Sequence, residues 1–221
     1  MNVLAANCAA IIPCHNEEAA IAQLVEEVRG QVAAIMVVDD GSEDRTSWLA
    51  RRAGAGCIRL QANHGKGAAL TAGLGAAWER GFSHALCLDG DGQHCPSDIP
   101  AFFTKAQATQ ADLVIGNRMV AREEMPPLRR IVNDWMSRRL SEYTKYALPD
   151  SQCGFRLVKL SSWRQEELRT RRFEFESEMI VAFARAGRRI EFVPIQTVYQ
   201  DQRSKIRPLG DAWRWLRWYL C

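Results

Sequence analysis

The residues best suited to chemistry in this chain are two carboxylates separated by one glycine. Asp89, Gly90 and Asp91 follow directly on the apolar run at residues 85–88, which is typical of a buried strand. Carboxylates at the end of a buried strand repel each other unless a cation lies beside them, and Mg²⁺ or Mn²⁺ prefers such oxygen ligands. The sequence therefore predicts a divalent-cation site here, with a solvated acidic turn that caps a helix as the alternative.

Polar clusters end three of the predicted strands, at residues 13–17, 38–42 and 89–91. The carboxyl ends of parallel strands share one edge of a sheet, so we expect these clusters to converge on one crevice. A carboxylate of the second cluster can accept a hydrogen bond from an imide N–H or a ribose hydroxyl. Two common phosphate-binding motifs are excluded, because the glycine-rich turn is not a P-loop and the first strand is not followed by a dinucleotide fingerprint.

Strand and helix patterns alternate over the first half of the chain, which favours an α/β fold with a mainly parallel central sheet flanked by helices. The strands expected in this half lie at residues 8–12, 34–38, 57–60, 85–88 and 113–116. Asn16 is expected to cap the first helix. The elements expected in the second half are helices at 128–147, 174–186 and 209–221, an edge strand at 154–158 and a last strand at 190–198. Residues 1–221 are expected to form one domain.

Composition argues against several classes of protein. The 29 Lys and Arg residues nearly balance the 26 Asp and Glu residues, so no long-range field favours nucleic acid. The seven cysteines lack paired or metal-ligand spacing, which predicts a reducing compartment without disulfides or zinc. The first residues lack the basic start of a secretory signal, and no apolar run approaches the roughly 20 residues of a membrane span. We therefore expect a globular cytoplasmic protein.

Five motifs occur in order along the chain, at residues 12–18 (IPCHNEE), 37–42 (VVDDGS), 63–68 (NHGKGA), 89–94 (DGDGQH) and 114–118 (VIGNR). Together they make the chain resemble family 2 glycosyltransferases over most of its length. The resemblance is greatest to the branch of dolichyl- and polyprenyl-phosphate mannosyl- and glucosyltransferases. It implies a GT-A fold, a nucleotide-sugar donor, Mg²⁺ or Mn²⁺ as cofactor, and an inverting reaction.

The resemblance also assigns roles to residues of these motifs. The residues expected to contact the nucleotide-sugar are Pro13, His15, Glu17, Val38, Asp40, Asp89, Gly90, Asp91 and Arg118. Asp91 and Gln93 match the metal ligands. Arg203 and Lys205 resemble a mobile basic loop that closes over the donor phosphates, with surface exposure as the alternative. His15 stands where the family usually has tyrosine, so base stacking is expected to differ there.

Two glutamates, Glu176 and Glu178, lie in a segment that resembles the family's Phe-x-x-x-Glu helix. One of them can act as general base toward a hydroxyl acceptor, a role that typically contributes about 10²–10⁴-fold in rate. Pairing with Arg171 or Arg172 is the alternative. A lipid phosphate acceptor is already anionic and requires no base. Residues 150–156 resemble the acceptor-side segment of the family.

The last residues combine aromatic and basic side chains. Trp213, Trp215 and Trp218 are interspersed with Arg214 and Arg217, a composition that suits an amphipathic helix in a membrane interface. A helix that packs on the sheet or on a partner is the alternative. The arginines at positions 129, 130, 138 and 139 favour an acceptor at a membrane surface.

These observations predict an inverting, metal-dependent transferase that moves a hexose from a nucleoside-diphosphate sugar of the GDP-mannose or UDP-glucose type. The expected acceptor is a polyprenyl phosphate or another lipid-linked molecule, reached by a peripheral protein at the cytoplasmic membrane face. The alternatives are transfer to a hydroxyl of a glycan or lipid and, from another class, a catalytically silent nucleotide-sugar-binding module. A pyrophosphorylase is disfavoured, because its glycine-rich basic signature does not follow the first strand.

Overall fold

The computed structural model describes residues 2–120, 125–197 and 208–220, without the side chains of residues 208–213. Its strands are β1 (Cys8–Cys14), β2 (Ala34–Asp39), β3 (Gly56–Arg59), β4 (His84–Cys87), β5 (Leu113–Asn117), β6 (Arg156–Lys159) and β7 (Ile190–Pro194). Its α-helices are α1 (Ile21–Val28), α2 (Thr46–Arg52), α3 (Lys66–Glu79), α4 (Ile99–Thr109), α5 (Pro127–Thr144), α6 (Leu160–Trp163), α7 (Glu174–Arg185) and α8 (Pro208–Leu220). Two short 3₁₀ helices, η1 (Ala5–Asn7) and η2 (Pro96–Asp98), precede β1 and α4. The predicted basic loop with Arg203 and Lys205 lies outside the described residues.

Within the described residues, the strands form one seven-stranded sheet in the order β3-β2-β1-β4-β6-β5-β7. β1 pairs in parallel with β2 and β4, β2 with β3, and β5 with β7. β6 pairs antiparallel with both β4 and β5. The mainly parallel α/β fold predicted from the sequence is confirmed. The prediction that residues 154–158 form an edge strand is wrong, because β6 fills the gap between the two parallel groups.

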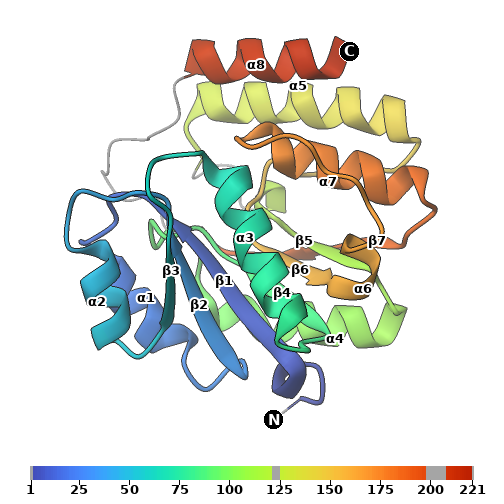
Figure 1. Ribbon diagram of the computed structural model, residues 1–221. Coiled ribbons are helices and arrows are strands. Elements are labelled where there is room, and N and C mark those ends of the chain that lie inside the picture. Colours follow the sequence, from blue (N-terminus) through green and yellow to red (C-terminus); the bar gives the residue numbers. More distant parts are fainter. Residues whose placement is uncertain (1, 121–124, 198–207, 221) are drawn as a thin grey trace.

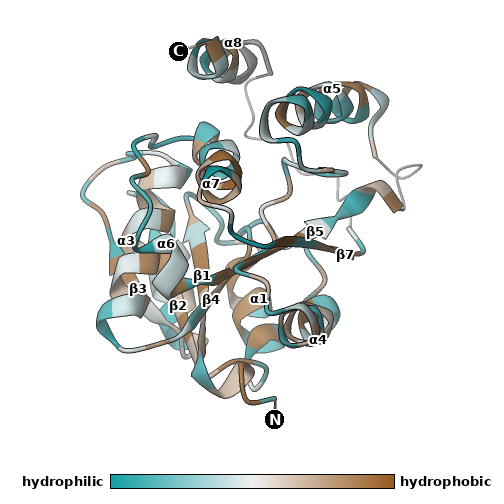
Figure 2. Ribbon diagram, turned by 90° about the vertical axis from the view of Figure 1, so that its right-hand side faces the viewer, coloured by the Kyte–Doolittle hydropathy of each residue, from teal (hydrophilic) through white to brown (hydrophobic). Residues whose placement is uncertain are grey.

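Burial explains why these segments form strands. All seven residues of β1 are buried, and β4 is buried along its whole length, as expected for strands that are covered on both faces. α1 and α4 lie on one face of the sheet, and α3 and α6 lie on the other (Figure 2). The core is one cluster that includes Ile11, Leu74, Leu86 and Phe102. This packed sheet holds the ends of its strands in defined positions.

The first helix begins later than the sequence predicts. Asn16 has a positive φ of 55°, and its Oδ1 accepts a hydrogen bond from the Glu43 N–H at 2.8 Å. In the turn that follows, the Glu17 N–H donates to the Thr46 hydroxyl at 2.8 Å. α1 starts only at Ile21, so the prediction that Asn16 caps it is wrong. Asparagine tolerates the left-handed region as well as it caps helices, and here a contact distant in sequence decides between the two.

Three helices form a layer above the carboxyl ends of the parallel strands, with α5 and α8 outside α7 (Figure 1). Trp215 of α8 is only 3% exposed, and its indole N–H donates to Ser177 Oγ of α7 at 2.9 Å. Its ring stacks on Tyr219 with centroids 5.1 Å apart and meets Trp135 of α5 edge-on at 5.4 Å. Insertion of Trp215 into a membrane interface is therefore contradicted, and packing on the protein is observed. No helix within the described residues is both long and apolar enough to cross a bilayer.

Candidate active site

The polar clusters at the strand ends meet at the carboxyl edge of the sheet. The Nδ1 of His15 lies 3.0 Å from the backbone oxygen of Asp40, which joins the first cluster to the second. The third cluster packs on the first, because a Cβ atom added to Gly90 would lie 2.4 Å from Cys14 Sγ and 3.4 Å from Glu17 Cγ. The convergence expected for parallel strands is therefore observed.

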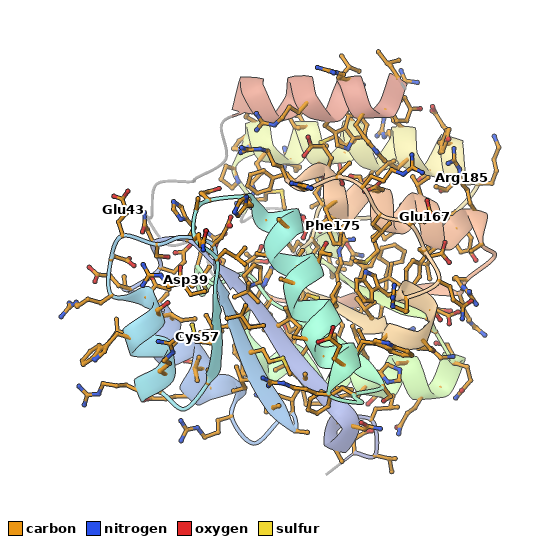
Figure 3. All side chains as sticks on the ribbon, viewed as in Figure 1. Asp39, Glu43, Cys57, Glu167, Phe175 and Arg185 are labelled. Carbon is orange, nitrogen blue, oxygen red and sulfur yellow. The ribbon has the colours of Figure 1, made fainter. Side chains whose placement is uncertain are left out.

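Asp39 is the last residue of β2 and lies at the carboxyl end of this strand (Figure 3). Its side chain holds the loop that follows. Its Oδ1 accepts the Ser42 N–H at 2.8 Å, and its Oδ2 accepts the Ser47 hydroxyl. Burial raises the pKa of Asp39, but these hydrogen bonds outweigh burial and leave the pKa below its ordinary value. The preceding residue, Val38, is fully buried and pairs in register with Pro13. Asp39 thus has a structural role that the sequence did not indicate.

Asp40 closes the glycine-rich turn at residues 63–67. Its Oδ1 accepts a hydrogen bond from the His64 N–H at 2.8 Å, and its Oδ2 accepts one from the Gly65 N–H at 2.7 Å. Only 4% of Asp40 is exposed. The carboxylate predicted to contact a nucleoside therefore fixes this turn at the carboxyl end of β2, and each oxygen keeps a second lone pair.

Lys66 belongs to this turn, and its side chain lies between two carboxylates. Its Nζ is 2.5 Å from Asp89 Oδ1 and 2.9 Å from Glu176 Oε1 of α7. The Lys66 side chain is 16% exposed and that of Glu176 is 7% exposed. Burial raises the pKa of Asp89 and lowers that of Lys66, but their attraction prevails, so the pKa of Asp89 is lowered and that of Lys66 raised. Sequence reasoning missed Lys66, although it is the single cation within the glycine-rich motif.

Residues 150–156 approach the same carboxylate. A Cβ atom on Gly154 would lie 2.6 Å from both carboxylate oxygens of Asp89, so a side chain does not fit there. Asp150 is fully buried and binds the Arg118 guanidinium through two hydrogen bonds of 2.8 and 2.9 Å, while Asn133 of α5 donates to it at 3.1 Å. Burial alone would raise the pKa of Asp150. The charge and hydrogen bonds of Arg118 outweigh burial, so the pKa of Asp150 lies below its ordinary value. The predicted donor-site arginine is thus held rigidly by the segment predicted to face the acceptor.

Asp91 and Gln93 lie on one tight turn. The Gln93 N–H donates to Asp91 Oδ1 at 3.0 Å, and Gln93 Oε1 accepts from Arg129 of α5 at 3.5 Å. No group of three His, Cys, Asp or Glu side chains suited to a metal occurs among the described residues. Mg²⁺ usually binds through one or two carboxylates together with substrate phosphates, and this carboxylate and amide oxygen suit that mode. The residues therefore fit a cation whose remaining ligands come from a bound donor.

The two candidate bases have different surroundings. Glu176 reaches the carboxyl edge through Lys66. Glu178 instead accepts hydrogen bonds from the Arg169 N–H at 3.0 Å and from the Thr170 N–H and hydroxyl at 2.9 and 2.6 Å. The alternative prediction was that these glutamates pair with Arg171 or Arg172. The partners observed are instead Lys66 for Glu176 and residues 169 and 170 for Glu178. Glu176 therefore lies at the carboxyl edge of the sheet, whereas Glu178 anchors the loop before α7.

The fold and this edge define a class: an α/β protein with carboxylates, a lysine and an arginine gathered where parallel strands end, as in enzymes that bind phosphorylated ligands. Residues 9–166 match the family described as Glycosyl transferase family 2. The chain belongs to this family and is a glycosyltransferase. The resemblance inferred from the five motifs is confirmed.

Named relatives cover most of the chain. The UDP-N-acetylglucosamine–dolichyl-phosphate N-acetylglucosaminyltransferase of Methanococcus voltae is 29% identical over 214 residues, covering 86% of this chain and 85% of the relative. The undecaprenyl-phosphate mannosyltransferase of Micrococcus luteus is 29% identical over 210 residues, with coverages of 86% and 83%. The solved structure of glucosyl-3-phosphoglycerate synthase from Mycobacterium tuberculosis, in complex with Mn²⁺, UDP-glucose and phosphoglyceric acid, is 20% identical. It matches with a TM-score of 0.74 over 97% of this chain and 78% of that one, which supports a GT-A fold.

Proposed function

We propose that this glycosyltransferase moves a hexose from a nucleoside-diphosphate sugar, of the GDP-mannose or UDP-glucose type, to a polyprenyl phosphate or another lipid-linked acceptor. The reaction is proposed to invert the anomeric centre and to use Mg²⁺ or Mn²⁺. The names of two relatives, which refer to dolichyl phosphate and undecaprenyl phosphate, support this acceptor class.

The observation that carries the proposal is an exposed apolar face on α5. Leu128, Ile131 and Trp135 are 66%, 62% and 44% exposed, and Val132 lies on the same side of the helix. The spacing of these residues forms one continuous stripe, which ends where Trp135 meets Trp215 of α8. The opposite side, which is buried, contains the polar residues Asn133 and Ser137 as well as Met136 and Leu140. An exposed apolar stripe of this kind on a helix of a globular protein marks a contact surface.

This apolar face begins beside the candidate site. Arg129, in the first turn of α5, contacts Gln93 of the turn that includes Asp91. Arg130 and Arg138 lie on the same helix and provide positive charge for an anionic surface. A lipid whose chain lies along α5 would present its phosphate near the Asp91 turn, which is the geometry that transfer to a lipid phosphate requires.

The chain's own residues then have distinct tasks in the proposed reaction. Asp91 and Gln93 would hold the divalent cation, which supplies positive charge to the leaving nucleoside diphosphate. Arg203 and Lys205, outside the described residues, are proposed to clamp the donor phosphates as charge develops on them. Arg118 is proposed to contact the nucleotide-sugar donor, and its guanidinium is held in position by Asp150. The acceptor phosphate attacks the sugar from the face opposite the leaving group, which inverts the anomeric centre and needs no general base.

A second candidate function is transfer to a hydroxyl, with Glu176 as general base. It is supported by the position of the Glu176 carboxylate, which is linked through Lys66 to Asp89 at the carboxyl edge. Glu178 is a weaker candidate, because its oxygens already accept hydrogen bonds from residues 169 and 170.

The test is a donor and acceptor panel. Labelled GDP-mannose, UDP-glucose and UDP-N-acetylglucosamine are each incubated with polyprenyl phosphate in vesicles or with free hydroxyl acceptors, with Mn²⁺, Mg²⁺ or a chelator. We expect transfer to the lipid phosphate, loss of transfer with the chelator, and an inverted anomeric centre by NMR. Transfer to hydroxyl acceptors alone would reject the lipid phosphate, and undiminished transfer with the chelator would reject the metal.

Substitution of the two glutamates separates the acceptor classes. With a lipid phosphate acceptor, Glu176→Gln is expected to lower the transfer rate less than tenfold, whereas a lost general base costs about 10²–10⁴-fold. Glu178→Gln is the matched variant, because it alters the same helix but only the loop anchor. A loss in the larger range for Glu176→Gln alone, with unchanged donor affinity, would favour the hydroxyl reaction.

A further inference from the structure

Lys66 connects two carboxylates that come from distant parts of the chain. Asp89 follows β4, Glu176 lies in the first turn of α7, and the ammonium is within 2.5 and 2.9 Å of them. A carboxylate pair in such a buried place is costly unless a cation compensates it. Lys66 supplies this compensating charge, and Arg118 adds further positive charge near Asp89.

The turn that carries Lys66 is fixed on both sides. Asp40 accepts the N–H groups of residues 64 and 65 on one side. On the other side, the Ala68 N–H donates to the Arg171 backbone oxygen at 2.9 Å. A Cβ atom on Gly67 would lie 2.7 Å from both the Arg171 backbone and Phe175 Cβ, so the chain entering α7 crosses directly over this glycine. The ammonium of Lys66 is therefore positioned by backbone contacts and not by side-chain packing alone.

We propose that Lys66 is a positioning residue that ties Asp89 to Glu176 and withholds Asp89 from the divalent cation, so that Asp91 is the carboxylate that ligates it. The proposal rests on the metal dependence in the proposed function. Its physical basis is competition, since an ammonium at 2.5 Å and a divalent cation cannot both occupy the same side of one carboxylate oxygen. Lys66 also keeps Glu176 at the carboxyl edge, where either acceptor would arrive.

Competition predicts opposite effects for two substitutions. Lys66→Met removes the ammonium and leaves two facing carboxylates, which should attract Mn²⁺ more strongly than the native protein does. Glu176→Gln removes one of the two partners of Lys66 and leaves the ammonium entirely to Asp89, which should weaken or preserve the response to Mn²⁺ but not increase it. A lysine with only a structural role would lower the stability of the fold without changing the response to the metal.

The measurement is the shift in Tm caused by MnCl₂, without donor, in the full chain. We expect the shift to be larger in Lys66→Met than in the native protein, and no larger than native in Glu176→Gln. Lys105→Met, a half-buried lysine on α4, is the matched control and should match the native shift. Lys66→Met should also lower transfer at least tenfold, because Asp89 and Glu176 lose the ammonium that holds them in position.

Any other order of the Tm shifts, including equal shifts in Lys66→Met and the native protein, overturns the proposal. If Lys66→Met does not fold, Asp89→Asn decides, since a carboxylate withheld from the cation can be neutralised without loss of the Mn²⁺ shift, and loss of that shift overturns the proposal. The Tm shifts test the role of Lys66, whereas the donor panel tests the proposed function, so either can be rejected without the other. A protein that transfers no sugar in the donor panel but shows the expected order would lose the function and keep the role of Lys66.

Discussion

The carboxyl edge of the sheet and the helical layer above it differ in how their polar and apolar residues are used. At the edge, Asp40, Asp89 and Arg118 each have specific partners within the protein. In the layer, α8 has the more aromatic sequence but buries Trp215, whereas α5 has the more basic sequence but exposes Leu128. Composition alone therefore identifies an amphipathic helix but not which of its faces is turned outward.

The difference predicts that substitutions at the edge affect chemistry and those in the layer affect stability or surface binding. The largest expected effect is that of Asp91→Ala. Loss of a metal ligand at the developing diphosphate is expected to lower transfer on the order of 10³-fold or more. Vesicle binding should be unchanged, because Asp91 is not part of the α5 face.

Asp134→Ala on α5 is the control for Asp91→Ala, because it removes a half-buried carboxylate away from the edge. It should retain activity. Normal turnover by Asp91→Ala in the presence of a chelator would show that the edge does not act through a metal.

The second prediction concerns Trp215. Trp215→Ala removes a buried ring and an indole hydrogen bond to Ser177, so the free energy of unfolding measured in urea should fall by about 3–5 kcal/mol. Trp218→Ala, a half-buried neighbour, should cost less. If Trp215→Ala kept the native stability but lost vesicle binding, α8 and not α5 would be the helix that contacts the membrane.

The third prediction tests the α5 face directly. The double substitution Leu128→Ser and Ile131→Ser removes two exposed apolar side chains, so binding to anionic vesicles should weaken about tenfold or more, with little change in Tm. Val3→Ser is the control, because Val3 is 78% exposed and lies outside the layer. Each arginine near the surface adds about 1 kcal/mol, which salt screens, so an apolar remainder should persist at high salt. Equal vesicle binding by the double variant and the control would exclude α5 as the contact surface.

The parts of the fold that the sequence predicted are those set by local patterns. Apolar runs mark β1, β2 and β4, and the rule that parallel strands end at one edge correctly assigned Asp40 and Asp89 to the same edge. β6 was misplaced, because four residues have no periodicity that distinguishes an edge strand from a central antiparallel one. Lys66 was missed, because its significance depends on Glu176, which is 110 positions away (176 − 66) and reaches it only through the tertiary fold.

The smallest predicted effect lies at the opposite end of the sheet from the active edge. His84 begins β4, is 9% exposed and contacts Ser83 Oγ at 2.8 Å. Burial, with a smaller contribution from Lys159, lowers the pKa of His84 from 6.5 to about 4. Between these values the unfolded chain binds a proton that the folded chain does not, so stability is lost as the pH falls. From pH 7 to pH 5.5 this group should cost about 1 kcal/mol of unfolding free energy.

The measurement is urea unfolding of the native protein and of His84→Gln at both pH values. Burial also lowers the pKa of His94 at the carboxyl edge, which gives a slope of the same sign, so the difference between native protein and variant isolates His84. The variant should lose less stability on acidification, and its transfer rate at pH 7 should equal the native rate, because His84 is remote from the edge. A variant with the native pH dependence would mean that the pKa of His84 is not lowered in the folded protein. A variant with impaired transfer would mean that the two ends of β4 are coupled.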